Sequence, residues 1–323
     1  MLAPAADRRG HGWQGLRWSQ TAAIVAQMLD HLEAAVAKRD SLLTADTDAV
    51  RLIDGAGDGL PGMVLESYAG RWLLSTVTDT IPPQVGEWLR DGAHSCYGKQ
   101  LDRHLKQSPT RLCGPEVTAP FLIREHGANY EISFQAGYSQ GIFLDQRDNR
   151  AEVRRVMRPG LTLLNAFAYT GAFSVAAALA GAQTTTLDLS PTYLEWAKRN
   201  FAHNGLDPAA HHFCKGDTFH WLRRFAKQGR RFDAIVLDPP TFSRDDQGKV
   251  FRAEQDFGLL AALAAEVLAP NGWLLCCTNF RGITSRDFEQ QLLAALPRPM
   301  HALRAVMPTD FPDTPYLKSV WLR

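Results

Sequence analysis

Four groups of polar and aromatic residues in the second half of the chain directly follow apolar runs. They are Asn165-Ala166-Phe167-Ala168-Tyr169-Thr170-Gly171, Asp188, Gly216-Asp217 and Asp238-Pro239-Pro240-Thr241-Phe242. A carboxylate accepts hydrogen bonds from hydroxyl or amino groups, and two consecutive prolines stiffen a loop while removing two backbone donors. A stiff loop that begins with an acid can hold a reacting group in place. Taken singly, each aspartate could equally be a helix cap or part of a solvated turn.

The elements that would position these groups alternate along the chain. Apolar runs predict buried strands, and the segments between them predict helices that begin or end at proline, glycine or an N-cap serine. The predicted strands are 161–164, 184–187, 233–237 and 273–277, and the predicted helices are 171–180, 191–204 and 256–268. Repeated strand–helix units imply an α/β fold with a mostly parallel, doubly wound sheet, in which ligands bind at the carboxyl ends of the strands. An acid that ends the second strand, as Asp188 does, commonly accepts the two hydroxyls of a ribose.

A smaller unit is expected before this sheet. Short β-type runs at 51–53, 63–65 and 72–77, separated by glycines, predict a small α+β domain over 46–135 that could contact RNA. The glycine-rich run 54–62 is interpreted as a turn, because it lacks the Gly-Lys-Ser/Thr ending of a phosphate-binding loop. Residues 1–45 predict an amphipathic helix, packed on its own domain rather than serving as a docking arm. The larger α/β domain is then 136–323.

Composition excludes several classes of protein. The chain has 35 Lys+Arg and 34 Asp+Glu, a formal net charge of +1, so no chain-wide basic footprint is present. Five cysteines without C-x-x-C spacing indicate neither a zinc site nor a disulfide framework, and no metal is expected. The uncharged stretch 159–187 fits a buried strand, loop and helix better than a membrane span. No targeting segment is visible, so the expected location is the cytoplasm.

The order of the four strand-end groups resembles that of the class I S-adenosylmethionine-dependent methyltransferases, whose domain is Rossmann-like. The resemblance narrows upstream, because 137–150 (GYSQGIFLDQRDNR) is similar to the segment before the methyltransferase domain in bacterial 23S ribosomal RNA methyltransferases that make 5-methylcytosine or 7-methylguanine. Residues 58–62 and 316–318 also resemble parts of that family. The match covers about 50–323, whereas residues 1–45 depart from the small RNA-binding domain that begins many 5-methylcytosine members.

The resemblance implies S-adenosylmethionine as the cofactor and assigns the site residues. Asn165, Phe167, Thr170 and Gly171 would shape the methionine part of the pocket, with Asp188 on the ribose, Asp217 near the adenine, and Phe143 and Gln146 closing the pocket. Asp238 would lie beside the donor methyl group. Pro239 and Pro240 would fix its loop, and Phe242 would stack on a base extruded from RNA. Phe242 could instead be an ordinary core aromatic.

The cysteines bear on which base atom is attacked. Carbon 5 of cytosine needs a cysteine thiolate to activate the ring, whereas N7 of guanine already carries a lone pair. Counting from Gly272, the position of the turn cysteine in the 5-methylcytosine relatives is Asn279 here, and Cys276 and Cys277 fall inside the predicted strand as buried thiols. Guanine N7 is therefore favoured, cytosine carbon 5 comes next, and Asn279 joins the candidate catalytic residues.

Arginines at intervals of three and four predict a helix face that reads an RNA backbone. They are Arg147, Arg150, Arg154 and Arg158, and the alternative is a solvated face paired with acids. The predicted function is methylation of a base in RNA, with 23S ribosomal RNA or an assembly intermediate of the ribosome as the partner and no membrane partner. A small-molecule or protein methyltransferase, and an RNA-binding module with a vestigial site, are the alternatives. A homodimer is among the assemblies that the sequence allows.

Overall fold

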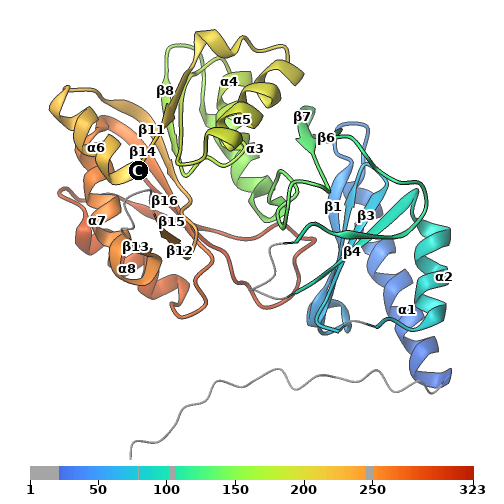
Figure 1. Ribbon diagram of the computed structural model, residues 1–323. Helices are drawn as coiled ribbons and strands as arrows, with labels where there is room; N and C mark the ends of the chain where they lie inside the picture. The colour runs from blue at the N-terminus through green and yellow to red at the C-terminus, as the bar shows by residue number, and fades with distance from the viewer. Residues whose placement is uncertain (1–21, 79, 102–106, 245–249) are drawn as a thin grey trace, which may run out of the picture.

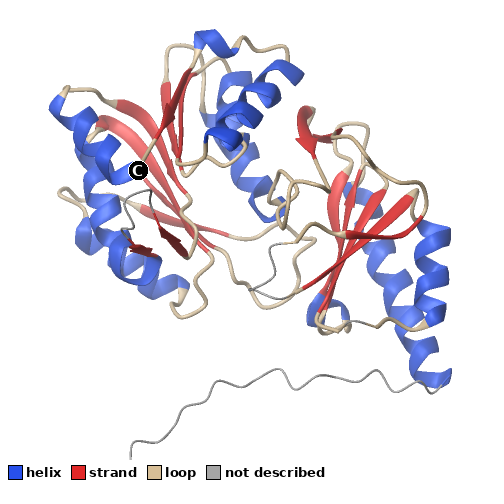
Figure 2. Ribbon diagram, in the orientation of Figure 1, coloured by secondary structure: helices blue, strands red, loops and turns tan. Residues whose placement is uncertain are grey.

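The computed structural model describes residues 22–78, 80–101, 107–244 and 250–323. Its strands form two main sheets in separate bodies, joined by loops and by the 121–132 hairpin (Figure 2). The part of the predicted N-terminal helix before Ala22 lies outside the described residues.

The N-terminal sheet has five strands in the order β1-β2-β3-β4-β5. These are β1 (Ala49–Asp54), β2 (Met63–Tyr68), β3 (Arg71–Thr76), β4 (Ser95–Gln100) and β5 (Thr110–Cys113). The pair β3–β4 is parallel and is connected through helix α2 (Pro83–Gly92), while the other pairs are antiparallel. Helix α1 (Ala22–Arg39) lies with α2 beside this sheet (Figure 1) and buries Met28, Leu32 and Ala35 against it. The amphipathic helix thus packs on the neighbouring sheet.

The glycine-rich run 54–62 connects β1 to β2, as its turn signals predict. It contains the short 3-10 helix η2 (Gly55–Asp58), and Gly55, Gly59 and Gly62 have positive φ. Asp58 is buried, and its two carboxylate oxygens accept hydrogen bonds from the two terminal nitrogens of Arg39, at the end of α1, each at 2.7 Å. Its carboxylate therefore has a structural partner. A second 3-10 turn, η1 (Asp40–Leu42), follows α1.

A hairpin joins the two bodies. It consists of β6 (Phe121–Glu125) and β7 (Ala128–Ile132) around the two-residue turn His126-Gly127, both residues of which have positive φ. Glu131 on β7 accepts hydrogen bonds from Arg199, and Asn129 exchanges hydrogen bonds with Asn204. The hairpin is therefore anchored on the C-terminal body.

The C-terminal sheet has seven strands in the order β10-β9-β8-β11-β14-β16-β15, and its first five strands are parallel. The fold is thus α/β with a mostly parallel, doubly wound sheet, as predicted. Its strands are β8 (Thr162–Ala166), β9 (Gln183–Asp188), β10 (His212–Lys215), β11 (Phe232–Leu237), β14 (Leu268–Thr278), β15 (Ala302–Ala305) and β16 (Lys318–Leu322). Its helices are α3 (Arg147–Val156), α4 (Ala172–Leu179), α5 (Pro191–His203), α6 (Thr218–Lys227), α7 (Ala253–Glu266) and α8 (Ser285–Ala295). The 3-10 turns η3 (Leu144–Gln146) and η4 (Pro208–Ala210) and the two-stranded pair β12 (Phe242–Arg244) and β13 (Val250–Arg252) complete the assignment.

Successive residues of the central strands face opposite layers of helices. Ala234 and Val236 belong to a core with α3 and α4, whereas Ile235 and Leu237 belong to a core with α6, α7 and α8. A strand buried on both faces has no polar alternation, which explains its continuous apolar run. The uncharged stretch 159–187 forms β8, α4 and β9, as predicted. Over the described ranges, the structure contains no helix that is both long and apolar enough to cross a membrane.

Several boundaries differ from the sequence prediction, most of all the start of β14. Helix α7 begins at Ala253 and ends at Glu266, and β14 begins at Leu268, so the Pro270-Asn271-Gly272 turn lies within β14 rather than between helix and strand. The ladder between β11 and β14 shifts register between Phe232 and Ala234, opposite that turn. Between the pairs Phe232–Leu268 and Ala234–Trp273 lie one residue of β11 and four residues of β14, so β14 bulges out of the ladder at this turn.

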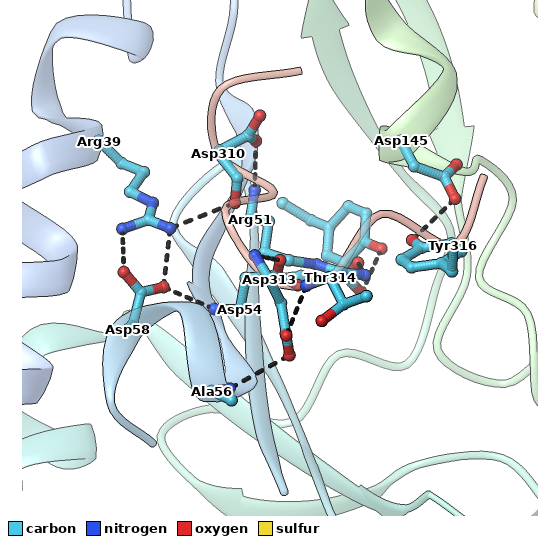
Figure 3. Close-up of polar contacts among 12 residues, drawn as sticks. Arg39, Arg51, Asp54, Ala56, Asp58, Asp145, Asp310, Asp313, Thr314 and Tyr316 are labelled. Atoms are coloured by element: carbon cyan, nitrogen blue, oxygen red, sulfur yellow. Dashed lines mark hydrogen bonds and ion pairs between the residues drawn. The ribbon is translucent and has the colours of Figure 1, made fainter. Parts of the chain in front are cut away.

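The chain between β15 and β16 crosses back to the N-terminal sheet (Figures 1 and 3). Within it, the Asp310 carboxylate accepts hydrogen bonds from the Arg147 guanidinium and from the backbone N–H of Arg51 on β1, at 2.9 Å for the latter. Arg39 donates to the Asp310 carbonyl, and the Arg51 guanidinium lies 4.2 Å from the centre of the Phe311 ring. This crossing segment therefore fixes the N-terminal sheet against α3.

Candidate active site

The loop after β8 has a strained backbone at the carboxyl end of the sheet. Phe167 and Tyr169 have positive φ angles of 57° and 51°, which non-glycine residues rarely adopt. Gly171 has φ of 75°, and a Cβ there would lie 2.7 Å from the Cβ of Ala197, so only glycine fits. Strained residues persist where the surroundings hold them, and they gather at ligand sites.

Side chains from neighbouring elements hold this loop. The Thr170 hydroxyl donates to the Gly141 carbonyl at 2.5 Å, and Asn200 on α5 donates to the Thr170 carbonyl at 2.9 Å. Asn165 is buried, and its amide donates to Ser174 on α4 at 3.0 Å. Asn165 and Thr170 are therefore placed to shape the loop from beneath. Their direct contact with a cofactor stays a prediction.

Asp188 at the end of β9 is tied to the same loop. Its two carboxylate oxygens accept the backbone N–H groups of Tyr169 and Ser190, each at 2.8 Å. Partial burial raises the pKa of Asp188 from its ordinary value, against the backbone hydrogen bonds that lower it. Each carboxylate oxygen can accept a second hydrogen bond, so the residue can also take two hydroxyl donors.

Replacing Asp188 with alanine should weaken binding of S-adenosylhomocysteine at least about tenfold, because hydrogen bonds to a charged group contribute about 1.5–3 kcal/mol each. Isothermal titration calorimetry measures this loss. Asp207→Ala is the matched control, since Asp207 also caps a turn, accepting the N–H of Ala209 at 2.9 Å, but follows α5 away from the carboxyl edge. Equal affinity in Asp188→Ala and Asp207→Ala would contradict the ribose assignment.

Asp217 caps the next helix. Its Oδ1 accepts the N–H of His220 in the first turn of α6 at 2.8 Å, and Gly216 donates to the Asp188 carbonyl at 3.0 Å. The residue is half-buried at the same sheet edge as Asp188. The helix-cap alternative is thus realised, and a contact with adenine stays a prediction.

Asp238 follows β11 and lies against Gln146. The Gln146 amide donates to Oδ2 of Asp238 at 3.0 Å. Burial, and to a lesser extent the neighbouring Asp145 carboxylate, raise the pKa of Asp238 to about 7. An acid that titrates near neutral pH beside a strained loop is typical of a functional site.

The rest of the proline loop reaches the end of β14. Pro239 is buried and Pro240 is exposed, while the Thr241 hydroxyl donates to Oδ1 of Asn279 at 2.6 Å. Asn279 is exposed in the turn after β14, so this hydrogen bond links the two loops. Phe242 begins β12, but its side chain lies outside the described part of the structure, so its stacking role stays a prediction.

Phe143 lies over the strained loop. It is 50% exposed, and its ring centre is 5.3 Å from that of Tyr169, which in turn packs edge-on against Tyr193 at 4.6 Å. An apolar ring left half exposed beside polar strand ends suits the cover of a cofactor. The residues present therefore fit a nucleoside cofactor with a charged end, with acids along the sheet edge and an aromatic ring above them.

The arginine stripe is the part of the predicted site that the structure contradicts. Arg147 and Arg150 are only 4% and 3% exposed, because Arg147 pairs with Asp310 and Arg150 pairs with Glu125 at 2.6 and 2.7 Å. Arg154 is half-buried and donates to the His126 carbonyl. Arg158 is exposed but precedes the amino end of β8, at the sheet edge opposite the site. The prediction of one exposed RNA-binding face was therefore wrong.

Both cysteines of β14 are buried, as expected. Cys276 and Cys277 are 0% exposed, and burial raises the pKa of both thiols. A thiol in that state is a poor nucleophile. Within the described residues, no group of three or more His, Cys, Asp or Glu side chains could hold a metal ion.

The sequence reasoning missed the side chains that support Asp238 from below. They are Asn149 on α3, and Ser319 and Trp321 on β16. A buried asparagine near the start of a helix and a serine within an apolar strand are weak signals that point to polar pairing, but neither names its partner.

Together, the sheet order and the loops at its carboxyl edge define a Rossmann-like transferase with a nucleoside cofactor. A family model described as S-adenosylmethionine-dependent methyltransferase matches residues 95–320, and the chain belongs to this family. Its cofactor is accordingly S-adenosylmethionine.

Known proteins of similar sequence and structure are also named as methyltransferases. YwbD of Bacillus subtilis, provisionally named a ribosomal RNA large subunit methyltransferase, is 32% identical, with 98% of this chain and 85% of that protein covered. Ribosomal RNA large subunit methyltransferase I of Erwinia tasmaniensis is 30% identical, covering 90% of this chain and 76% of its own. SMU.776, a protein assigned to the methyltransferases and crystallised as a complex with SAH, superposes with a TM-score of 0.84 at 28% identity, covering 93% of this chain and 82% of that chain.

Proposed function

We propose that this enzyme methylates a base of large-subunit ribosomal RNA, with N7 of guanine as the favoured atom and carbon 5 of cytosine second. The relatives named above as ribosomal RNA large subunit methyltransferases support the RNA substrate. The observation that carries the choice of atom is the position of the thiols, because Cys276 and Cys277 are fully buried and the exposed turn position is Asn279.

The bound cofactor supplies an electrophilic methyl group, and the chain's own residues supply alignment and charge. Asp238, at the start of a proline-stiffened loop, accepts hydrogen bonds from N–H donors of the incoming base. Asn279 and Thr241 hold the facing loop, and Phe143 excludes water from above. A guanine N7 needs no covalent activation, so orientation is sufficient chemistry for this site.

The rim of the site offers groups for RNA in place of the buried arginines. Arg281 is exposed two residues after Asn279, and its guanidinium lies 5.6 Å from the centre of the Tyr316 ring. Lys318 donates to the carbonyls of Phe280 and Tyr316, which ties the turn after β14 to the strand that follows the crossing segment. A phosphate contact at Arg281 is consistent with this arrangement.

Mass-spectrometric nucleoside mapping of ribosomal RNA, from cells with and without the gene, tests the proposal. We expect one 7-methylguanine to disappear from the large-subunit RNA and to return when purified enzyme and S-adenosylmethionine are added. Loss of a 5-methylcytosine instead would support ribosomal RNA as the substrate but would contradict guanine N7 as the methylated atom. Unchanged ribosomal RNA would overturn the substrate.

The double variant Cys276→Ser, Cys277→Ser should retain methyl transfer to within about tenfold, because loss of a true covalent nucleophile costs several orders of magnitude. Transfer of a radiolabelled methyl group to RNA from the deletion strain measures this. Circular dichroism shows whether the variant is folded. A folded variant without activity would point to covalent activation and hence to cytosine.

A further inference from the structure

A line of buried hydrogen bonds connects the last strand of the sheet to Asp238. The Trp321 indole donates to Oδ1 of Asn149 at 3.2 Å, Nδ2 of Asn149 donates to Oε1 of Gln146 at 2.7 Å, and Nε2 of Gln146 donates to Oδ2 of Asp238 at 3.0 Å. Trp321, Asn149 and Gln146 are at most 5% exposed. We call this line, with Ser319, the tryptophan relay.

The indole fixes the direction of every bond in the relay. An indole N–H can only donate, so the oxygen of the Asn149 amide must face Trp321. The nitrogen of Asn149 then faces Gln146 and Ser319, whose Oγ accepts its second N–H at 2.9 Å. The Gln146 amide consequently presents its oxygen to Asn149 and its nitrogen to Asp238. Reversing either amide would set like atoms against each other.

Three packed elements hold the relay rigid. Asn149 lies on α3, Trp321 and Ser319 lie on β16, and Ser319 is paired in register with Cys277 on β14. The Cys277 thiol lies 3.5 Å from the Ser319 hydroxyl oxygen and 3.8 Å from Oε1 of Gln146. The Trp321 ring packs against Trp273 with centres 4.8 Å apart. A buried, fully directed network of this kind specifies one arrangement.

We infer that Trp321, Asn149 and Ser319 are positioning residues, which lock Gln146 as a donor and so hold Asp238 as an ionised acceptor in the active site. The inference depends on the proposed function only where RNA methylation is the measurement.

The orientation of the Gln146 amide affects the ionisation of Asp238, because several charged and titratable groups surround this carboxylate. Burial, and after it the Asp145 carboxylate in η3, raise the pKa of Asp238, whereas the Gln146 amide and the Arg150 guanidinium on α3 lower it. The Cys277 thiol faces Asp238 from β14 and stays protonated, since burial raises its pKa. If Gln146 could turn its oxygen toward Asp238, the Asp238 carboxylate would lose a hydrogen-bond donor and face an acceptor, and its pKa would rise. If Asp238 became a tenfold weaker acid, from a pKa near 7, its ionised fraction at neutral pH would fall about fivefold.

The test combines variants of the relay with two measurements. Trp321→Phe and Asn149→Leu should raise the pH at which Asp238 titrates, followed by carboxyl carbon NMR with the signal assigned by its loss in Asp238→Asn. They should also lower kcat/KM for RNA methylation about fivefold near pH 7 while recovering most of it near pH 9. Ser319→Thr keeps the hydroxyl and should keep the parent's pH profile.

Asn204→Leu is the control for loss of a half-buried, hydrogen-bonded amide. Asn204 hydrogen-bonds Asn129 on the hairpin and has no place in the relay, so its loss should leave the pH profile in position. An equal loss of activity at all pH values in Trp321→Phe and Asn149→Leu, with an unmoved Asp238 titration, would overturn the inference. The NMR titration uses the enzyme without RNA, so it decides this question even if the parent methylates no RNA, which would contradict the proposed function alone.

Discussion

The Asp310→Ala variant is expected to lose about 3–5 kcal/mol of unfolding free energy, because it leaves a buried arginine without its carboxylate. Asp310 is 0% exposed, and its two oxygens accept both terminal nitrogens of Arg147, at 2.5 and 3.0 Å. The same carboxylate accepts the backbone N–H of Arg51 (Figure 3). Asp148 also lies near Arg147, at 3.7 Å, but its side chain is exposed and solvent weakens the attraction.

Urea unfolding followed by tryptophan fluorescence measures this loss. Glu289→Ala is the control, because Glu289 pairs with Arg304 at 2.6 Å but the arginine is half exposed, and such surface pairs contribute about 1 kcal/mol or less. Asp310→Asn keeps the shape and one acceptor oxygen, and serves if the alanine variant does not fold. A loss in Asp310→Ala no larger than in Glu289→Ala would contradict a stabilising role for this carboxylate.

Asp310 also shows where sequence reasoning stops. The spacing of Arg147 and Arg150 predicts one helix, and both residues lie on α3, but spacing shows only which residues share a face of that helix. What covers that face comes from Asp310, 163 residues away, and from Glu125 on the hairpin. Pairing over such separations depends on tertiary packing, and no local pattern records it.

The strand ends were predictable for the opposite reason. An apolar run followed by an acid is a local signal, and parallel strands bring their carboxyl ends to one edge whatever the loops between them. Asp188 and Asp238 therefore fall at that edge, as the predicted sheet requires. The relay beneath them needed the register that sets Cys277 opposite Ser319. That register belongs to an antiparallel pair formed across a long crossing segment.

The second large effect concerns Asp238. Asp238→Asn should lower methyl transfer by about 10²–10³-fold at pH 8, because it removes a preorganised charge from the site while keeping its size. The same change should stabilise the fold at that pH. Burial raises the pKa of Asp238 from 3.8 to about 7. Between those pH values the folded state binds a proton that the unfolded state has released, and above pH 7 the folded state holds the charge in a buried site.

The sign of the stability change follows from that difference. Below about pH 4 the carboxyl is protonated in both states, and an amide in its place changes little. As the pH rises toward 7, the parent loses stability because the unfolded chain ionises more readily, and above 7 it bears the full cost of a buried carboxylate. Asp238→Asn avoids this cost, so its advantage should grow between about pH 4 and 7 and reach on the order of 4 kcal/mol.

Thermal or urea unfolding of both forms at several pH values measures this advantage, alongside methyl transfer to RNA. Asp233→Asn is a matched control, since Asp233 is half-buried like Asp238. It lies on β11, however, and accepts hydrogen bonds from the N–H and the hydroxyl of Thr162 at the amino end of the sheet. It should affect methyl transfer little and should not become more stable above pH 7.

If Asp238→Asn is less active but no more stable than the parent, the Asp238 carboxyl ionises easily in the folded protein. A more stable variant with full activity would remove Asp238 from the reaction. Loss of activity together with a pH-dependent gain in stability is the combination expected of a buried carboxylate that destabilises the fold but is required for methyl transfer.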